Sequence, residues 1–453
     1  MQSLKLKNKE FYLKLFSLAL PITIQNLISS SLGVVDSVMV GSLGNQSLAA
    51  VGVANQYGLI VFLLYNAIHS GCGIYVAQFW GKNDHDNIGR VVNLDIAIAA
   101  SVSLILSAIG ILLPEQIISV FNTDPVVISQ GADFLRILSM SFVFASISFG
   151  FSVALRSIGK STMPMIISAS ALALNTILNY ILIYGRFGMP QMGVRGSATS
   201  TLIARIVEMI LFLIAVSKYF PLLKIRVSEL MKVTKDLLGR VTKTMIPVIL
   251  NEMCWGLGTV VYSIAYGRIS TEAFDAVQIT NNVVNLFTVA AFGMASAAAV
   301  MTGHVIGAGE EKKGRQYAWG FVRLCIIGGF ILGGLLYLFS PSIVSLFKVS
   351  SDVLETSIIL LAINAIILPI RFTNIVAIVG VLRGGGDASF AFIAEGMTMW
   401  LIGVPLSFIG AFVLRLDVQW VVLMVMAEEI VKMICGVARL RSNKWIKNVV
   451  REI

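Results

Sequence analysis

Two carboxylates interrupt long apolar segments of this sequence. Asp36 lies within SSSLGVVDSVMVG, and Glu252 lies within PVILNEMCWGLGTVVY. Inside a membrane-spanning helix an ionisable side chain costs at least ~2.5 kcal/mol on insertion scales, and it usually marks the path of an ion or a substrate. We therefore regard Asp36 and Glu252 as the first candidates for functional chemistry.

Each acid belongs to a polar stripe on one helical face. Residues three or four positions apart in a helix lie on the same face, and this spacing joins Asn26, Ser29, Gly33 and Asp36. Adding 226 to these positions gives Glu252, Trp255, Thr259 and Tyr262. The acid is at the outer end of the first stripe and at the inner end of the second, about 15 Å apart in depth. We expect both stripes to line a central cavity.

A second group of polar residues lies near the level of Asp36. Asn175 and Asn179 are four residues apart in ALALNTILNYILIYG, so their side chains project together. The segment GVRGSATST adds Ser197 and Thr199 at a similar level. A carboxylate, two amide carbonyls and a hydroxyl form an oxygen-only set suited to a hard cation such as Na⁺. This pattern predicts a sodium site at Asp36, Asn175 and Asn179, with Thr199 beside it.

Two other interpretations of these residues stay open. In dry surroundings Asp36 could carry a proton in place of Na⁺. The asparagine pair could instead serve only as a hydrogen bond between helices, as it does in many membrane bundles. The sequence does not choose between Na⁺ and H⁺.

The elements that must position these residues are membrane-spanning helices. Of the 453 residues, 57% are hydrophobic and only 13% are charged, about half the charged share of a soluble protein. A helix needs about 20 mostly apolar residues to cross the hydrocarbon layer. Twelve segments meet this requirement: 12–38, 48–72, 92–113, 131–154, 163–184, 194–217, 245–267, 276–302, 317–339, 355–381, 388–413 and 418–438. The predicted fold is an all-α polytopic membrane protein.

Several functional classes are disfavoured by what the sequence contains. The four cysteines share no CxxC spacing and the three histidines lie far apart, which argues against disulfide scaffolds, thiol redox motifs and zinc clusters. An intramembrane enzyme would need acid–base groups or metal ligands clustered at one depth, and the sequence suggests no such grouping. We expect a protein that is not an enzyme and needs no cofactor beyond a coupling ion.

The distribution of basic residues predicts the orientation in the membrane. One side of the predicted spans collects 24 lysines and arginines, including those at both termini and in the central linker. The opposite side holds only Arg186, Arg195, Arg268, Lys348 and Arg415. The positive-inside rule therefore places both termini and the linker in the cytoplasm. Because the basic residues are spread over seven loops, the net charge of +10 does not indicate nucleic-acid binding.

The two halves of the chain are copies of one unit. A constant offset of 226 aligns Pro21 with Pro247, Gly41 with Gly267, and AAVGVANQ with DAVQITNN. The predicted organisation is an N-terminal lobe of six spans at 1–217, a cytoplasmic linker at 218–244 and a C-terminal lobe of six spans at 245–453. Two bundles with an even number of spans run in the same sense, as in parallel-repeat transporters, whose substrate lies between the repeats.

The C-terminal half offers further candidates for substrate contact. These are Glu252, Trp255 and Tyr262 in the second stripe, together with Gln278, Asn281 and Asn282 at the start of the eighth span. Hydration of the cavity or ordinary helix packing would explain the three amides equally well. Arg383 is expected to anchor a cytoplasmic loop, and Arg205 with Glu208 to form a structural ion pair. No role follows for Arg371, Glu395, Glu428 or Glu429.

Several of these motifs resemble the multidrug and toxic compound extrusion (MATE) family. The resemblance rests on PITIQNLISSSLGVVDSVMVGSLG, the NxxxNY pair, GVRGSATST and the LRxxG turns, and it covers essentially the whole chain. It implies a twelve-helix, V-shaped, two-lobed antiporter, similar to bacterial NorM-type or DinF-type members, that expels organic cations using inward Na⁺ or H⁺. In that family the positions matching Asp36, Asn175, Asn179 and Thr199 form the coupling site.

The resemblance also bears on the second acid and on the partners. Glu252 matches the acid that NorM-type members carry in the seventh span. The aspartate that they tend to have in the tenth span is absent from PIRFTNIV, so Glu252 is expected to meet a cationic substrate. The implied partners are cationic amphipathic small molecules and membrane lipid, and the implied setting is the plasma membrane of a bacterium, with the protein a monomer. The alternative is a lipid-linked precursor flippase of the same wider superfamily, although its cavity would be expected to carry cationic groups rather than acids.

Overall fold

The computed structural model describes residues 2–347 and 349–451, and helices are the regular elements of this part of the chain. Lys348, one of the basic residues expected on the outer side, lies outside the described residues. Eleven of the described helices are long and apolar enough to cross a membrane. This confirms the predicted class, an all-α multi-span membrane protein.

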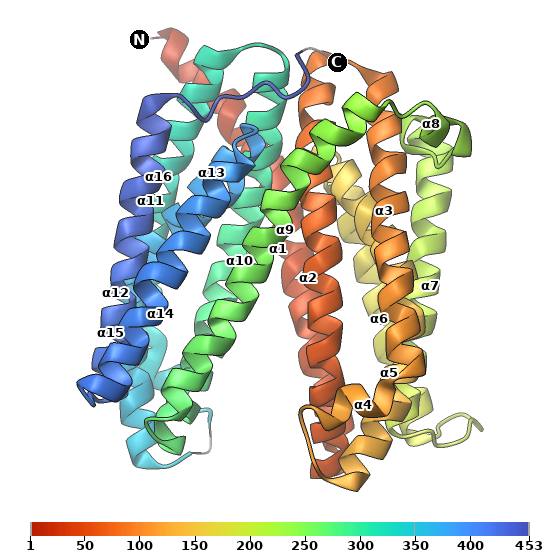
Figure 1. Cartoon of the computed structure of the whole chain (residues 1–453), viewed down its shortest axis with the longest axis vertical. Helices are drawn as coiled ribbons and strands as arrows, with labels where there is room; N and C mark the ends of the chain where they lie inside the picture. Colours follow the sequence, from red (N-terminus) through yellow and green to blue (C-terminus); the bar gives the residue numbers. More distant parts are fainter. Residues whose placement is uncertain (1, 348, 452–453) are drawn as a thin grey trace. The chain divides into compact units, whose positions relative to one another are not determined.

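The helices of the first half are α1 (Gln2–Gly41), α2 (Asn45–Lys82), α3 (His85–Leu112), α4 (Pro114–Ser119), α5 (Pro125–Ser157), α6 (Thr162–Tyr184) and α7 (Val194–Tyr219). The linker holds the 3₁₀ turn η1 (Pro221–Leu223) and α8 (Val227–Met231). The helices that follow it are α9 (Lys235–Gly267), α10 (Thr271–Gly307), α11 (Glu311–Val344) and α12 (Ser351–Asn374). Figure 1 shows this order in colour from red to blue.

The last third of the chain mixes α-helix with π-helix. The π-helical segments are η2 (Ile375–Leu382), η3 (Ile393–Met397), η4 (Met399–Gly403) and η5 (Ile409–Val413). The α-helical segments between and after them are α13 (Ala388–Phe392), α14 (Val404–Phe408), α15 (Val418–Val425) and α16 (Ala427–Ser442). Single-turn π segments within α-helices occur often at functional sites.

The twelfth predicted span, at 418–438, consists of two helices. A turn at Met426 separates α15 from α16, and Glu428, Glu429 and Lys432 all belong to α16. With 8 and 16 residues, each of the two helices is too short to span a membrane alone, although together they have the length of one span. The two-bundle, twelve-helix architecture is consistent with this arrangement.

The chain divides into two compact units. The first contains the start of the chain up to Thr23, residues 81–83 and residues 246–453; the second contains residues 24–80 and 84–245. The beginning of α1 joins the first unit because Phe11 and Leu15 are buried in its core, where Phe11 packs against Tyr317 and Phe321 of α11. A division of the chain at the linker would therefore separate Phe11 from the α11 residues against which it packs.

Small residues let the helices of the first unit approach closely. Ala295 and Ala298 of α10 lie against Gly380 of η2, where a Cβ would come within 2.8 Å of the Ala295 carbonyl oxygen. In the second unit α5 packs against α3 and α7, and Phe151 stacks on Phe212 with ring centroids 6.5 Å apart. α6 packs against α7 in the same unit, which brings the asparagine pair of α6 to the polar residues of α7.

Candidate functional site

Asp36 is held by α6 in the second unit. Nδ2 of Asn179, a fully buried residue, donates a hydrogen bond to Oδ1 of Asp36. The same Nδ2 lies 3.1 Å from Oδ1 of Asn175, one turn earlier in α6. The spacing of four residues thus places both amides beside the carboxylate.

The amides have hydrogen-bonding capacity to spare. Oδ1 of Asn179 is buried and has no partner among the described residues. With the Asn175 amide turned over, its Nδ2 lies 3.3 Å from Asp36 Oδ1 and its Oδ1 accepts from the Thr201 hydroxyl at 3.3 Å. Rotated amides can therefore present either N–H groups to a bare carboxylate or oxygens to a cation.

The hydroxyl that joins this group belongs to Thr201, not to Thr199. Nδ2 of Asn175 donates to Thr201 Oγ1 at 3.3 Å, whereas the Thr199 hydroxyl donates to the Arg195 carbonyl of its own helix at 2.8 Å. Two residues in a helix are separated by about 200°, so the two threonines cannot share a face. The signal that could have found Thr201 is its spacing of four from Ser197, a buried residue of the same segment.

A chain of hydrogen bonds runs through the second unit from Arg205 to Arg156. The predicted pair of Arg205 and Glu208 is confirmed, with 2.7 Å between Nη1 and Oε2. Ser168 donates to Glu208 at 2.9 Å, and Gln25 donates to Ser168 at 2.9 Å and accepts from Arg156 at 2.6 Å. Arg205 also interacts with the charge of Asp36. The carboxylate of Asp36 is thus bonded to an amide, while the nearby guanidinium is engaged by Glu208.

Glu252 already has a cationic partner in its own unit. Its Oε1 lies 2.9 Å from Nη1 of Arg383, whose side chain is only 4% exposed. Arg383 follows η2 directly and is buried in the first unit rather than anchoring a solvated loop. The prediction that Arg383 anchors a loop is therefore corrected, because a buried guanidinium needs a counter-charge and Glu252 supplies it.

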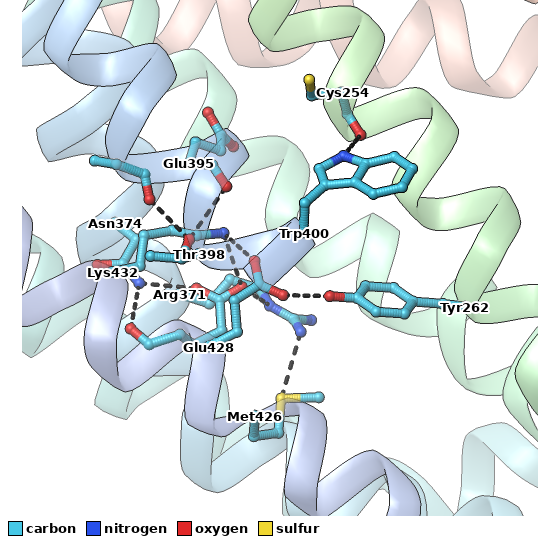
Figure 2. Close-up of polar contacts among 12 residues, drawn as sticks. Cys254, Tyr262, Arg371, Asn374, Glu395, Thr398, Trp400, Met426, Glu428 and Lys432 are labelled. Carbon is cyan, nitrogen blue, oxygen red and sulfur yellow. Dashed lines mark hydrogen bonds and ion pairs between the residues drawn. The ribbon is translucent and has the colours of Figure 1, made fainter. Parts of the chain in front are cut away.

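The other predicted residues of the C-terminal half are half-buried or exposed. Tyr262 donates to Glu428 at 2.5 Å, as Figure 2 shows. Trp255 is 41% exposed on α9, Gln278 is half-buried on α10, and Asn281 and Asn282 of α10 are exposed. The structure joins Tyr262, but not Trp255, to the acidic residues of this unit.

Residues without an expected role form a network of buried charges. Lys432 lies 2.7 Å from Glu428 (Figure 2). It also lies 4.0 Å from Glu429, which lies 3.4 Å from Arg371 and accepts a hydrogen bond from Asn374 at 2.8 Å. The signal in the sequence was AEEIVK, where Glu428 and Lys432 are four residues apart.

Comparison with known proteins shows the family to which the chain belongs. The MatE family model matches residues 21–181 and residues 247–409, once in each half of the chain. The chain belongs to the MatE family. Members of this family are transporters, so the protein is a transporter and not an enzyme, and the two matched segments agree with the predicted repeat.

The chain is similar to several MatE proteins over nearly its full length. It is 27% identical to the uncharacterized transporter YisQ of Bacillus subtilis, over 96% of this chain and 95% of that protein. It is 24% identical to the probable multidrug resistance protein NorM of Thermotoga maritima, over 96% and 94%. The crystal structure of the Vibrio cholerae MATE transporter VcmN in the bent form shares its fold, with a TM-score of 0.88 and 17% identity over 97% of this chain and all of that one.

Proposed function

We propose that this protein is a secondary active transporter that exports organic cations by antiport with Na⁺ or H⁺, and that Asp36 is the residue that binds the coupling ion. The observation that carries the proposal is the Asp36 carboxylate hydrogen-bonded to the buried amide of Asn179. The relatives named as multidrug resistance proteins, such as NorM, support export of small-molecule drugs.

Asn175, Asn179 and Thr201 complete the proposed ion site. With Asp36 they supply a carboxylate, two amide oxygens and a hydroxyl, a donor set that suits Na⁺. A proton on Asp36 would use the same surroundings, with the amides accepting in place of donating. In either case the ion drives transport through its different affinity for the two access states, because only a differential affinity can shift a conformational equilibrium.

Efflux from proteoliposomes tests the proposal. Wild-type protein should export ethidium under a pure sodium gradient or under a pure pH gradient, and Asp36→Asn should lower efflux to background in both. Asp236→Asn is the matched control, since that carboxylate is 64% exposed and should leave efflux unchanged. Wild-type efflux by folded Asp36→Asn protein would refute the role of Asp36.

The protein is a multi-span membrane protein, and we assign it to the plasma membrane of a bacterium as a monomer, with both termini in the cytoplasm. The support for this orientation is the excess of basic residues, 24 against five, on the side of the termini.

A further inference from the structure

Seven largely buried charges of the first unit form one group whose acids and bases are unequal in number, whereas the buried Asp387 is paired separately with Arg439 and Lys447. The carboxylates are Glu252, Glu395, Glu428 and Glu429, and the cations are Arg371, Arg383 and Lys432. Four acids against three bases leave one negative charge when all seven are ionised. An uncompensated charge that is largely withdrawn from water is costly, so a positive charge from outside the chain would be stabilised by this network.

The close pairs assign this excess charge to Glu395. Glu252 is paired with Arg383 at 2.9 Å, Glu428 with Lys432 at 2.7 Å, and Glu429 with Arg371 at 3.4 Å. Glu395 lies 3.9 Å from Nη2 of Arg383, and that nitrogen has no hydrogen-bond partner among the described residues. Lys432 also interacts electrostatically with Glu395, but its close contact is with Glu428. Glu395 is therefore the acid without a cation of its own.

A second, independent observation lies next to Glu395. Nδ2 of Asn251 donates to Oε2 of Glu395 at 2.8 Å. Asn251 is only 2% exposed, and its Oδ1 has no partner among the described residues. Leaving a buried acceptor unpaired costs about 1–3 kcal/mol, so this oxygen points to a ligand that brings an N–H donor.

The side chain of Trp400, like that of Glu395, contacts α9. Trp400 Nε1 donates to the Cys254 carbonyl oxygen of α9 at 3.2 Å, as Figure 2 shows, and Glu395 contacts α9 through Asn251, three residues before Cys254. Glu395 belongs to η3 and Trp400 to η4, both π-helical. The side chain of Glu395 is 17% exposed and Trp400 is 37% exposed, so both are open to a ligand.

We propose that Glu395, Asn251 and Trp400 form a binding subsite for the cationic nitrogen of a protonated organic amine. The Glu395 carboxylate supplies the opposite charge, Oδ1 of Asn251 accepts an N–H, and the face of the Trp400 indole offers a cation–π contact. The subsite rests on the proposed function in one respect, namely that its ligand would be a transported substrate. It is separate from Asp36, which belongs to the other unit.

Binding of proflavine to the purified full-length protein tests the subsite. This planar dye is cationic and its amino groups carry N–H donors. Glu395→Gln should weaken binding, measured by fluorescence titration, by about tenfold or more, since a hydrogen bond to a charged group contributes about 1.5–3 kcal/mol. Glu311→Gln is the control, because Glu311 is 57% exposed on α11 and should bind the dye as the wild type does.

A variant of opposite sign separates binding from structural damage. Lys432→Met raises the excess from one negative charge to two, so proflavine should bind more tightly, whereas a merely structural loss would weaken binding in both variants. Unchanged affinity in Glu395→Gln, weaker binding in Lys432→Met, or no binding by wild-type protein would each overturn the proposal. If Glu395→Gln does not fold, Asn251→Leu replaces it, and it should also weaken binding.

The same titration distinguishes this subsite from the proposed ion site. Asp36→Asn should abolish efflux while it still binds proflavine with an affinity that depends on Glu395. If wild-type protein exports no dye in proteoliposomes but Glu395→Gln still weakens binding, the transport proposal fails and the subsite stands. The reverse result, normal efflux with no effect of Glu395→Gln on binding, refutes the subsite alone.

Discussion

Thr199 and Thr201 are two residues apart in α7, and only the second reaches the amides beside Asp36. We predict that Thr201→Val lowers the affinity for the coupling ion several-fold, up to about tenfold, because one hydrogen-bonding oxygen of the site is lost. Thr199→Val should change it little, since its hydroxyl is bonded to the Arg195 carbonyl. The measurement is the dependence of dye efflux on Na⁺ concentration or on pH in proteoliposomes. Equal effects of the two substitutions would contradict the placement of Thr201 at the site.

The two threonines also show how far the sequence can predict the site. Asp36, Asn175 and Asn179 are polar residues in apolar helices, and their spacing was enough to place them on common faces. The choice between Thr199 and Thr201 depends on the rotation of α7 about its axis, which is set by its packing against α5 and α6. The pairing of Glu252 with Arg383 could not be predicted either, because the two residues are 131 positions apart and no local sequence pattern links them.

At the scale of the helices, Gly196 determines how closely α7 approaches α6. A Cβ at this position would lie 2.7 Å from the Leu182 carbonyl oxygen. We predict that Gly196→Val separates the helices, with a loss of stability of about 1–3 kcal/mol that is typical of overpacking. It should also weaken ion coupling, since Asn175 and Thr201 lie on the two helices. Gly328→Val in α11 is the control, because no atom lies within 4 Å of a Cβ there. The measurement is the melting temperature of each purified variant, and similar values for the two would refute the close contact.

Hydropathy predicted the number and order of the helices better than their ends or their internal geometry. α2 extends over Asn45–Lys82 although the predicted span was 48–72, and α9 begins at Lys235 within the expected linker. An apolar window reports only the part of a helix that crosses hydrocarbon, while the backbone remains helical beyond it. The π-helical segments have no signature in composition, because one extra residue in a turn changes hydrogen bonding without changing hydropathy.

At the scale of the whole chain, the repeat and the packing divide the residues differently. The offset of 226 residues pairs the beginning of α1 with the beginning of α9. In the structure, however, the start of the chain up to Thr23 packs with the C-terminal half. Sequence symmetry compares residues by descent from one ancestral unit, whereas packing depends on which apolar surfaces meet. Phe11, buried against Tyr317 and Phe321, could not have been assigned to that core from the repeat.

The asymmetry of basic residues makes a prediction about the orientation of the entire protein. Transfer of Lys and Arg across the membrane is disfavoured in short loops, and 24 of them are expected on the side of the termini against five on the other. In a background where the four native cysteines are replaced by serine, Met189→Cys should react with a membrane-impermeant maleimide added to intact cells. Ser442→Cys, at the end of α16, should react only after the cells are opened. Met189 is the matched position because it is 48% exposed in the loop between α6 and α7. Labelling of Ser442→Cys in intact cells would place the termini outside, and the direction of transport inferred for Asp36 would then be reversed.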